Sequence, residues 1–144
     1  MKNKKFEFLE HTSDAYVVAY GKTLEEAFEN AALAMFEVMT DTKKVEAKKK
    51  FEIKTTGFDL FSLLYNWLEE LLFIYSAYNM VLSKFKIRRI EKVNDEYQIE
   101  AEAYGELFDS KKHEQRTEVK AVTYSLMDIK KENGIYKVKV LFDI

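Results

Sequence analysis

Two aspartates lie where the chain turns or stops. Asp14 closes a short polar connection between two predicted strands, and Asp143 immediately precedes Ile144, whose α-carboxylate is also an anion. Hard cations such as calcium bind several oxygen ligands, which these groups would supply if the last strand lay beside the first hairpin. Spacing alone leaves another interpretation open, in which Asp14 caps a turn and Asp143 lies on a frayed surface.

Other motifs for catalysis are missing from the sequence. The four glycines do not form a phosphate-binding GxxxxGK[ST] loop or a GxGxxG turn, and neither GxSxG nor HExxH occurs. There is no cysteine, which excludes disulfides, thiolate catalysis and zinc ribbons. His11 and His113 are far apart in the sequence, and we expect each to be structural or loop-borne rather than catalytic. The motif search therefore identifies no reaction.

Composition and charge indicate a folded chain with a protein partner. The 144 residues are 47% hydrophobic, and 23 basic against 25 acidic residues give a net charge of -2. No overall positive field attracts naked RNA, and we interpret the run Lys48–Lys50 as a solvated strand edge. The uncharged stretch Leu71–Ser83 is shorter than the roughly 20 apolar residues that span a bilayer. No export signal is visible, so we expect a cytoplasmic protein without a membrane partner.

The first half of the chain predicts strands and two helices. Period-two burial indicates short strands around Phe6–Phe8 and Ala15–Ala19. Thr23 and Glu26 form a capping box that opens a helix over 24–39. Charged and apolar residues alternate over 45–56, as in a strand with one wet face. A second helix over 58–77 is apolar around most of its circumference, and its core is expected at Leu64, Trp67 and Leu71, packed with Phe28.

The second half predicts mainly strands. Alternation and turn residues indicate strands over 84–93, 97–107, 118–126 and 135–142, with a polar loop over 109–115. Asn94-Asp95 is a turn, and Asn133-Gly134 is the signal of a type I′ hairpin. No linker or repeat is visible, so we expect one domain over 1–144 of the α+β class, a sandwich of two helices packed on largely antiparallel β-sheet. The strand order does not follow from these patterns.

Three segments together resemble the archease family, small accessory proteins of tRNA processing. They are FEFLEHTSDAYVVAYGKTLEEAFENAALAMFEVMTD, LYNWLEELLF, and GELFDSKKHEQRTEVKAVTYSLMDI with the final DI. The resemblance covers essentially the whole chain. The first family signature commonly reads HTAD followed by Val or Ile and Gly, and here it is matched by His11, Thr12 and Asp14 but not at 13, 15 and 16. In the second, Ser125 stands where many relatives carry histidine, which argues against an essential acid-base role there.

The resemblance implies a function without catalysis by this chain. Archeases activate the GTP-dependent RNA ligase that joins tRNA halves, by promoting guanylylation of the ligase and hence its turnover. Contact with RNA would come mainly through that partner. In archaeal relatives a second role is described, as a chaperone-like modulator of a tRNA methyltransferase.

The resemblance also implies a metal site. The calcium-type site of the family maps onto Asp14, Asp143 and the terminal carboxylate of Ile144. Glu118 and Lys120 are matched positions too. We expect their side chains to point to opposite faces of the strand, so that only one of them lines the site unless a bulge intervenes. Two rival classes stay open: a free-standing metal-dependent hydrolase that uses Asp14 and Asp143, and a structural adaptor without a functional metal, which a large separation of the two aspartates would favour.

Overall fold

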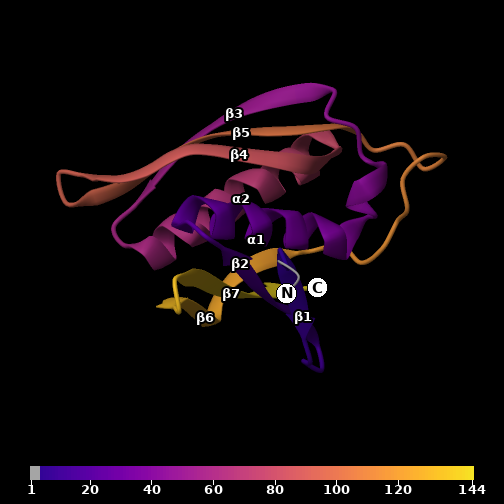
Figure 1. Cartoon of the computed structure of the whole chain (residues 1–144). Coiled ribbons are helices and arrows are strands. Elements are labelled where there is room, and N and C mark those ends of the chain that lie inside the picture. The colour runs from indigo at the N-terminus through magenta and orange to yellow at the C-terminus, as the bar shows by residue number, and fades with distance from the viewer. Residues whose placement is uncertain (1–3) are drawn as a thin grey trace.

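Two helices lie between two antiparallel β-sheets in the computed structural model, which describes residues 4–144 (Figure 1). The helices are α1 (Leu24–Met39) and α2 (Leu60–Tyr78). One sheet has four strands in the order β1-β2-β7-β6, and the other has three in the order β3-β5-β4. The expected α+β class, with two helices packed on antiparallel sheet, is confirmed. Within residues 4–144, no helix combines the length and the apolar character needed to cross a bilayer.

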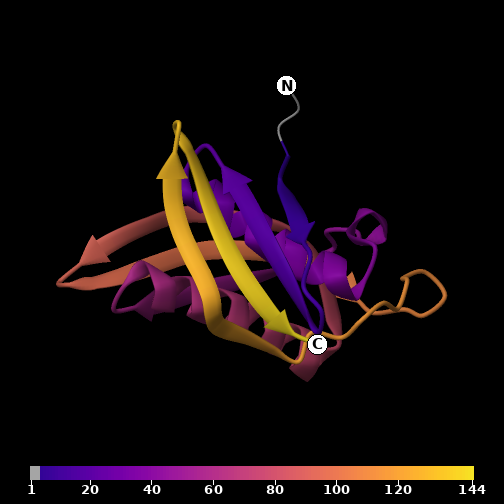
Figure 2. The ribbon, with the colours of Figure 1, turned by 90° about the horizontal axis from the view of Figure 1, so that it is seen from below.

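The four-stranded sheet places the C-terminal end of the chain beside the turn between its first two strands. Its strands are β1 (Phe6–Leu9), β2 (Asp14–Gly21), β6 (Ala121–Glu132) and β7 (Ile135–Asp143). Strand β7 pairs with β2 on one side and with β6 on the other. Figure 2 shows the C-terminal end of β7 beside the turn that connects β1 and β2.

The three-stranded sheet covers the other side of the helices. It consists of β3 (Lys49–Gly57), β4 (Met80–Val93) and β5 (Glu96–Leu107). Asn94 and Asp95, with φ of 52° and 64°, form the tight turn between β4 and β5, and Asn133 (52°) and Gly134 (77°) form the turn between β6 and β7. Both predicted hairpins are therefore present, with the positive φ values that a type I′ turn requires.

Three predicted strands begin elsewhere, each because of a local contact. Strand β3 starts at Lys49 rather than at Val45, because Asp41 caps a short 3₁₀ turn over Thr42–Lys44. Strand β4 starts at Met80, because α2 ends at Asn79 in the left-handed conformation and the chain turns directly into the sheet. Strand β6 starts at Ala121, because the segment before it is bonded to α1.

The helix starts agree with their capping residues. The Thr23 hydroxyl accepts a hydrogen bond from the Glu26 backbone N–H at 3.0 Å, and the Glu26 carboxylate accepts one from the Lys22 N–H at 2.6 Å. At α2, Asp59 and Ser62 form a reciprocal capping box, so the helix opens at Leu60 and not at the expected residue 58. These caps satisfy N–H groups that the first helical turn leaves without partners.

The core lies between the two sheets and is centred on the helices. Trp67, Phe28, Leu64 and Leu71 are each 0% exposed, as predicted from the apolar pattern. The Trp67 indole N–H donates to the Phe28 carbonyl at 3.0 Å, which joins the two helices at a buried point. Because a buried indole N–H needs a partner, this bond fixes the orientation of the largest core side chain.

A loop between β5 and β6 closes the C-terminal end of α1. The Arg116 guanidinium donates to the carbonyls of Glu37 (2.8 Å) and Thr40 (3.0 Å), and its Nη1 lies 2.9 Å from the Glu37 carboxylate. The Arg116 and Thr117 backbone N–H groups donate to Met39 and Val38. The last carbonyls of a helix have no partner within the helix, so this loop supplies what α1 lacks. We call these contacts of Arg116 and Thr117 with α1 the Arg116 clamp. The clamp also fixes the start of β6 beside the end of β7.

Candidate metal centre

Asp14 and Asp143 face each other across two neighbouring strands. Asp14 is the first residue of β2, Asp143 is the last residue of β7, and the two are direct partners in the antiparallel register. Side chains of directly opposed residues lie on the same face of a sheet, with Cβ atoms about 4.5 to 5.5 Å apart. The inward positions of these strands, Val17, Val140 and Phe142, are buried against the helices. By strand alternation, the two aspartates therefore project from the opposite, outer face.

Neighbouring groups contact the Asp14 carboxylate and the main chain of Asp143, and neither carboxylate is buried. Asp14 has 27% of its side chain exposed, and its Oδ2 lies 3.5 Å from Nδ1 of His11, in the turn before β2. The His11 ring packs edge to face on Tyr16, with ring centroids 6.0 Å apart. Asp143 is exposed, while its carbonyl accepts a hydrogen bond from the Lys120 N–H at 2.7 Å. The Ile144 side chain packs partly buried against the core, which holds the residue after Asp143 in place.

The carboxylates of Asp14 and Asp143 offer only oxygen donors, and His11 lies beside Asp14. Two carboxylates opposed across a ladder repel each other unless a cation or a donor neutralises them. Among the described residues 4–144, no cluster of three or more His, Cys, Asp or Glu side chains has the geometry of a metal site. A cation at the Asp14–Asp143 pair would therefore need further oxygens from the main chain, the terminal carboxylate or water. Oxygen donors of this kind fit a hard cation such as calcium or magnesium.

Glu118 and Lys120 lie in the segment that leads into β6. Both are exposed, and Val119 between them is buried, so both side chains lie on the solvent side of an extended segment. The expectation that the two side chains point to opposite faces is therefore wrong, because positions two apart in an extended chain share a side. This geometry does not select one of the two. Burial raises the pKa of the Tyr75 hydroxyl, and the negative charge of Glu118 raises it further. The Lys120 N–H donates to the Asp143 carbonyl, so Lys120 is the one of the two whose backbone contacts the aspartate pair.

Strand β6 is irregular where the sequence predicted simple alternation. The register with β7 shifts between Thr123 and Asp128, and Leu126 has a φ of 59° while its side chain is 56% exposed. The Tyr16 hydroxyl donates to the Leu126 carbonyl at 2.9 Å, which anchors the bulge on β2. Ser125 lies in this exposed bulge and is not opposite Asp14 or Asp143 in the register.

His113 has a structural role. It is 3% exposed, its Nδ1 accepts a hydrogen bond from the Asp109 N–H at 2.9 Å, and its Nε2 lies 3.0 Å from the Glu106 carboxylate. Because Nδ1 accepts, the hydrogen on the neutral ring is on Nε2 and is donated to Glu106. Burial acts to raise the pKa of Glu106, but hydrogen bonds from the Glu46 N–H, Lys112 and His113 outweigh it and lower that pKa to about 2. The buried carboxylate of Glu106 was not predicted from the sequence, where it is one more polar residue in an alternating strand.

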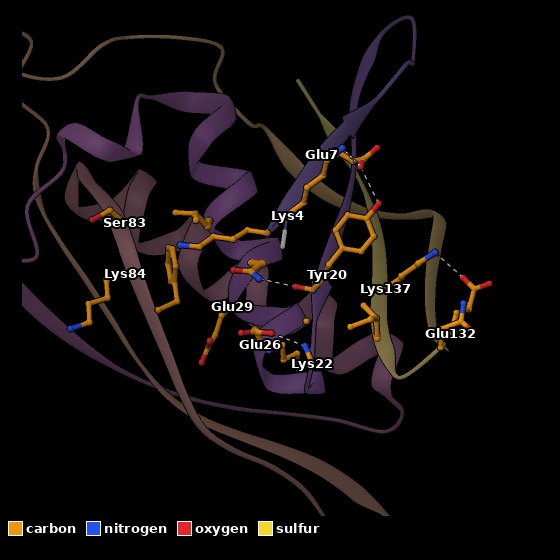
Figure 3. A pocket seen from close by; sticks show the side chains of 17 residues that line it. Lys4, Glu7, Tyr20, Lys22, Glu26, Glu29, Ser83, Lys84, Glu132 and Lys137 are labelled. Carbon is orange, nitrogen blue, oxygen red and sulfur yellow. Dashed lines mark hydrogen bonds and ion pairs between the residues drawn. The ribbon is translucent and has the colours of Figure 1, made fainter. Parts of the chain in front are cut away.

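A cavity lies apart from the aspartate pair. It has a volume of about 950 Å³ and lies between α1, the N-terminal strands, β4 and the turn between β6 and β7 (Figure 3). Its glutamates are already engaged: Glu7 with Lys4 and Tyr20, Glu29 with the Ile87 N–H, and Glu132 with Lys137. Ser83, the hydroxyl of its lining, donates to the Val45 carbonyl at 2.9 Å. These side chains are therefore held by contacts within the protein.

Known proteins share the sequence pattern and the fold of this chain. The model of the Archease protein family matches residues 6–144. The protein archease of Sulfurisphaera tokodaii is 50% identical over 141 residues, which cover 98% of this chain and 99% of that protein. The solution structure of Methanobacterium thermoautotrophicum protein 1598 has a TM-score of 0.86 and 48% identity, and the match covers 97% of this chain and 99% of that one.

A more distant structure shares the fold. The crystal structure of an archease from Thermotoga maritima, described as a possible chaperone, has a TM-score of 0.60 and 20% identity, with coverage of 100% of this chain and 98% of that one. At that identity the likeness concerns the fold alone. The match to the family model and the near-full-length relative are decisive, and the chain belongs to the Archease protein family.

Proposed function

We propose that this protein is an accessory factor of tRNA splicing that activates the GTP-dependent RNA ligase by promoting its guanylylation and turnover. Membership of the Archease protein family supports the accessory role. The observation that carries the proposal is the register of β2 and β7, which sets Asp14 opposite Asp143 at an exposed edge of the sheet. The near-neutral net charge of -2 suits docking on a protein, with contact to the RNA substrate made mainly by the ligase.

The proposed site consists of Asp14, Asp143 and the terminal carboxylate of Ile144, holding a divalent cation, most simply calcium. Its support is the chemistry of the donors, since hard cations bind carboxylate and carbonyl oxygens. When bound, the cation would supply positive charge to phosphate oxygens at the guanylylation step. The residues of this chain have a binding and positioning role: the two aspartates hold the charge, His11 orients Asp14, and the clamped Arg116 loop keeps Lys120 beside Asp143.

A ligase assay with and without this protein tests the proposal. We expect the wild-type protein to raise both the fraction of guanylylated ligase and the number of joining turnovers. Asp14→Asn and Asp143→Asn remove one negative charge each without changing the size of the side chain, and both should lose most of the activation. Asp95→Asn, in the turn between β4 and β5, is the matched control and should activate normally.

Each alternative function predicts a different result in these assays. Hydrolysis of phosphoesters by the purified protein, lost in Asp14→Asn, would replace the accessory role with that of a metal-dependent hydrolase. Full activation by both site variants would indicate a structural adaptor without a functional metal. Absence of any effect of the wild-type protein on the ligase, together with a change in the products of a tRNA methyltransferase, would favour the chaperone-like role.

A further inference from the structure

One side of α2 is open to solvent between the edges of the two sheets. Figure 1 shows α2 in the layer between the sheets, where it contacts an edge strand of each, β3 and β6. The Asn66 amide donates to the Thr56 carbonyl of β3 at 2.8 Å, and the Glu69 carboxylate accepts from the Val122 N–H of β6 at 3.2 Å. The side of the helix between these two contacts is exposed.

This exposed side carries aromatic rings toward both ends of the helix. Near the start, Phe61 is 38% exposed, and Tyr65 stacks on Tyr124 of β6 with ring centroids 4.4 Å apart. About two turns later, Phe73 is 56% exposed and meets the Tyr78 ring edge to face at 6.0 Å. Single exposed rings are ordinary, but several on one side of a helix indicate a contact surface. We call the side that bears Phe61, Tyr65, Phe73 and Tyr124 the α2 face.

An acidic groove lies between the two groups of rings. It has a volume of about 350 Å³, and it is lined by Thr55 of β3 and by Asn66, Glu69, Glu70 and Phe73 of α2. Glu69 uses one carboxylate oxygen in its bond to β6, which leaves the other free. Among residues 4–144, no basic side chain lies within ion-pair distance of Glu69 or Glu70. The groove therefore holds two carboxylates without a countercharge.

Charges on the neighbouring segments do not neutralise this pair. Helix α2 contains no basic residue. On β3, Lys54 points to the opposite side of the sheet from Thr55, and Lys49 lies at the start of the strand, away from the groove. In the segment before β6, Glu118 and Lys120 are both exposed and their charges cancel. The α2 face is therefore apolar and negative, which favours a partner surface that is apolar and positive.

We propose that the α2 face binds an amphipathic helix of a partner protein, with a lysine or arginine in the groove and an apolar side chain on the rings at each end. Tyr65, Glu69 and Phe73 follow one another at intervals of about one turn, so apolar, basic and apolar residues in successive turns of the partner match them. A second copy of this chain would set glutamates against glutamates, so charge selects a basic partner. The inference goes beyond the proposed function and uses no residue of the Asp14–Asp143 site, so either can fail alone.

Fluorescence anisotropy with a labelled peptide tests the groove. The probe is an alanine-rich helical peptide with leucine and lysine in alternate turns of one face, and the wild-type protein should bind it more weakly as salt rises. Glu69→Gln/Glu70→Gln should bind about fivefold more weakly or worse, while glutamine still accepts the bond from β6. The control Glu91→Gln/Glu96→Gln removes two exposed charges beside the turn between β4 and β5 and should keep the affinity. Equal losses in the two variants, or no binding by the wild-type protein at low salt, would overturn the proposal.

Charge reversal and removal of a ring test the specificity of the surface. Glu70 is exposed, so Glu70→Lys should unfold like the wild type but prefer a peptide with glutamate in place of lysine. Phe73→Gln should weaken binding of the lysine peptide about tenfold, whereas Phe8→Gln, which removes a half-exposed ring of β1, should not. An unchanged preference in Glu70→Lys would refute the role of the groove. A wild-type dimer in sedimentation that Phe73→Gln dissociates would show that a second copy occupies the α2 face instead.

Discussion

Replacing Arg116 by alanine should destabilise the protein and loosen the loop that fixes the start of β6. The guanidinium bonds two carbonyls at the end of α1 and lies 2.9 Å from the Glu37 carboxylate. A hydrogen bond from a charged donor contributes about 1.5 to 3 kcal/mol, but Arg116 has 31% of its side chain exposed, so water replaces part of each bond. We therefore expect a loss of about 2 kcal/mol in the free energy of unfolding.

Denaturant unfolding and amide hydrogen exchange measure the two effects. Arg89→Ala is the stability control, because it removes one exposed ion pair, which is worth about 0.5 kcal/mol or less. Exchange should accelerate at Thr117 and Lys120, whose N–H groups donate to Val38 and Asp143, and stay slow in β5. If Arg116→Ala costs no more than Arg89→Ala and leaves the exchange at Lys120 unchanged, the clamp does not hold the loop.

Three further variants test other parts of the structure. Trp67→Ala should cost about 3 to 5 kcal/mol in thermal or denaturant unfolding, because it empties a fully buried site, and a cost below 1 kcal/mol would contradict the core assignment. Glu106 has its pKa lowered to about 2, so its contribution to stability is present above pH 4.5 and is lost as the pH falls toward 2; Glu106→Gln should be less stable at pH 7 and lose that pH dependence, which denaturation from pH 2 to 7 would detect. Leu126 has a φ of 59°, so Leu126→Gly should stabilise by about 0.5 to 1 kcal/mol, and a clear destabilisation would show that the side chain has a packing role.

Local signals predicted most of the elements. The capping box at Thr23, the apolar surface of α2 around Trp67 and the two hairpin turns depend on residues close in sequence, and the structure confirms all of them. The strand order could not be predicted, because alternation shows which side of a strand is buried but not which strand lies next to it. The starts of β3 and β6 were wrong for a related reason, since an Asp41 cap and the bonds from Thr117 to α1 override a strand-like pattern.

The candidate site was only partly accessible from the sequence. Residue types singled out Asp14 and Asp143, but only the resemblance to a family placed them together, because their proximity depends on the pairing of the second and last strands. The Arg116 clamp and the Tyr16 bond to the bulge at Leu126 left no local pattern, since each joins residues distant in the chain.

Cation binding by the protein alone tests the central claim most directly. Terbium, a luminescent substitute for calcium, should bind in one copy per chain, be sensitised by nearby tyrosines such as Tyr16, and be displaced by calcium. Asp14→Asn and Asp143→Asn should each abolish binding, a short extension after Ile144 should weaken it by moving the terminal charge, and Asp95→Asn should leave it intact. Terbium binding that is unchanged in both Asp14→Asn and Asp143→Asn would contradict the assignment of the metal site to this pair.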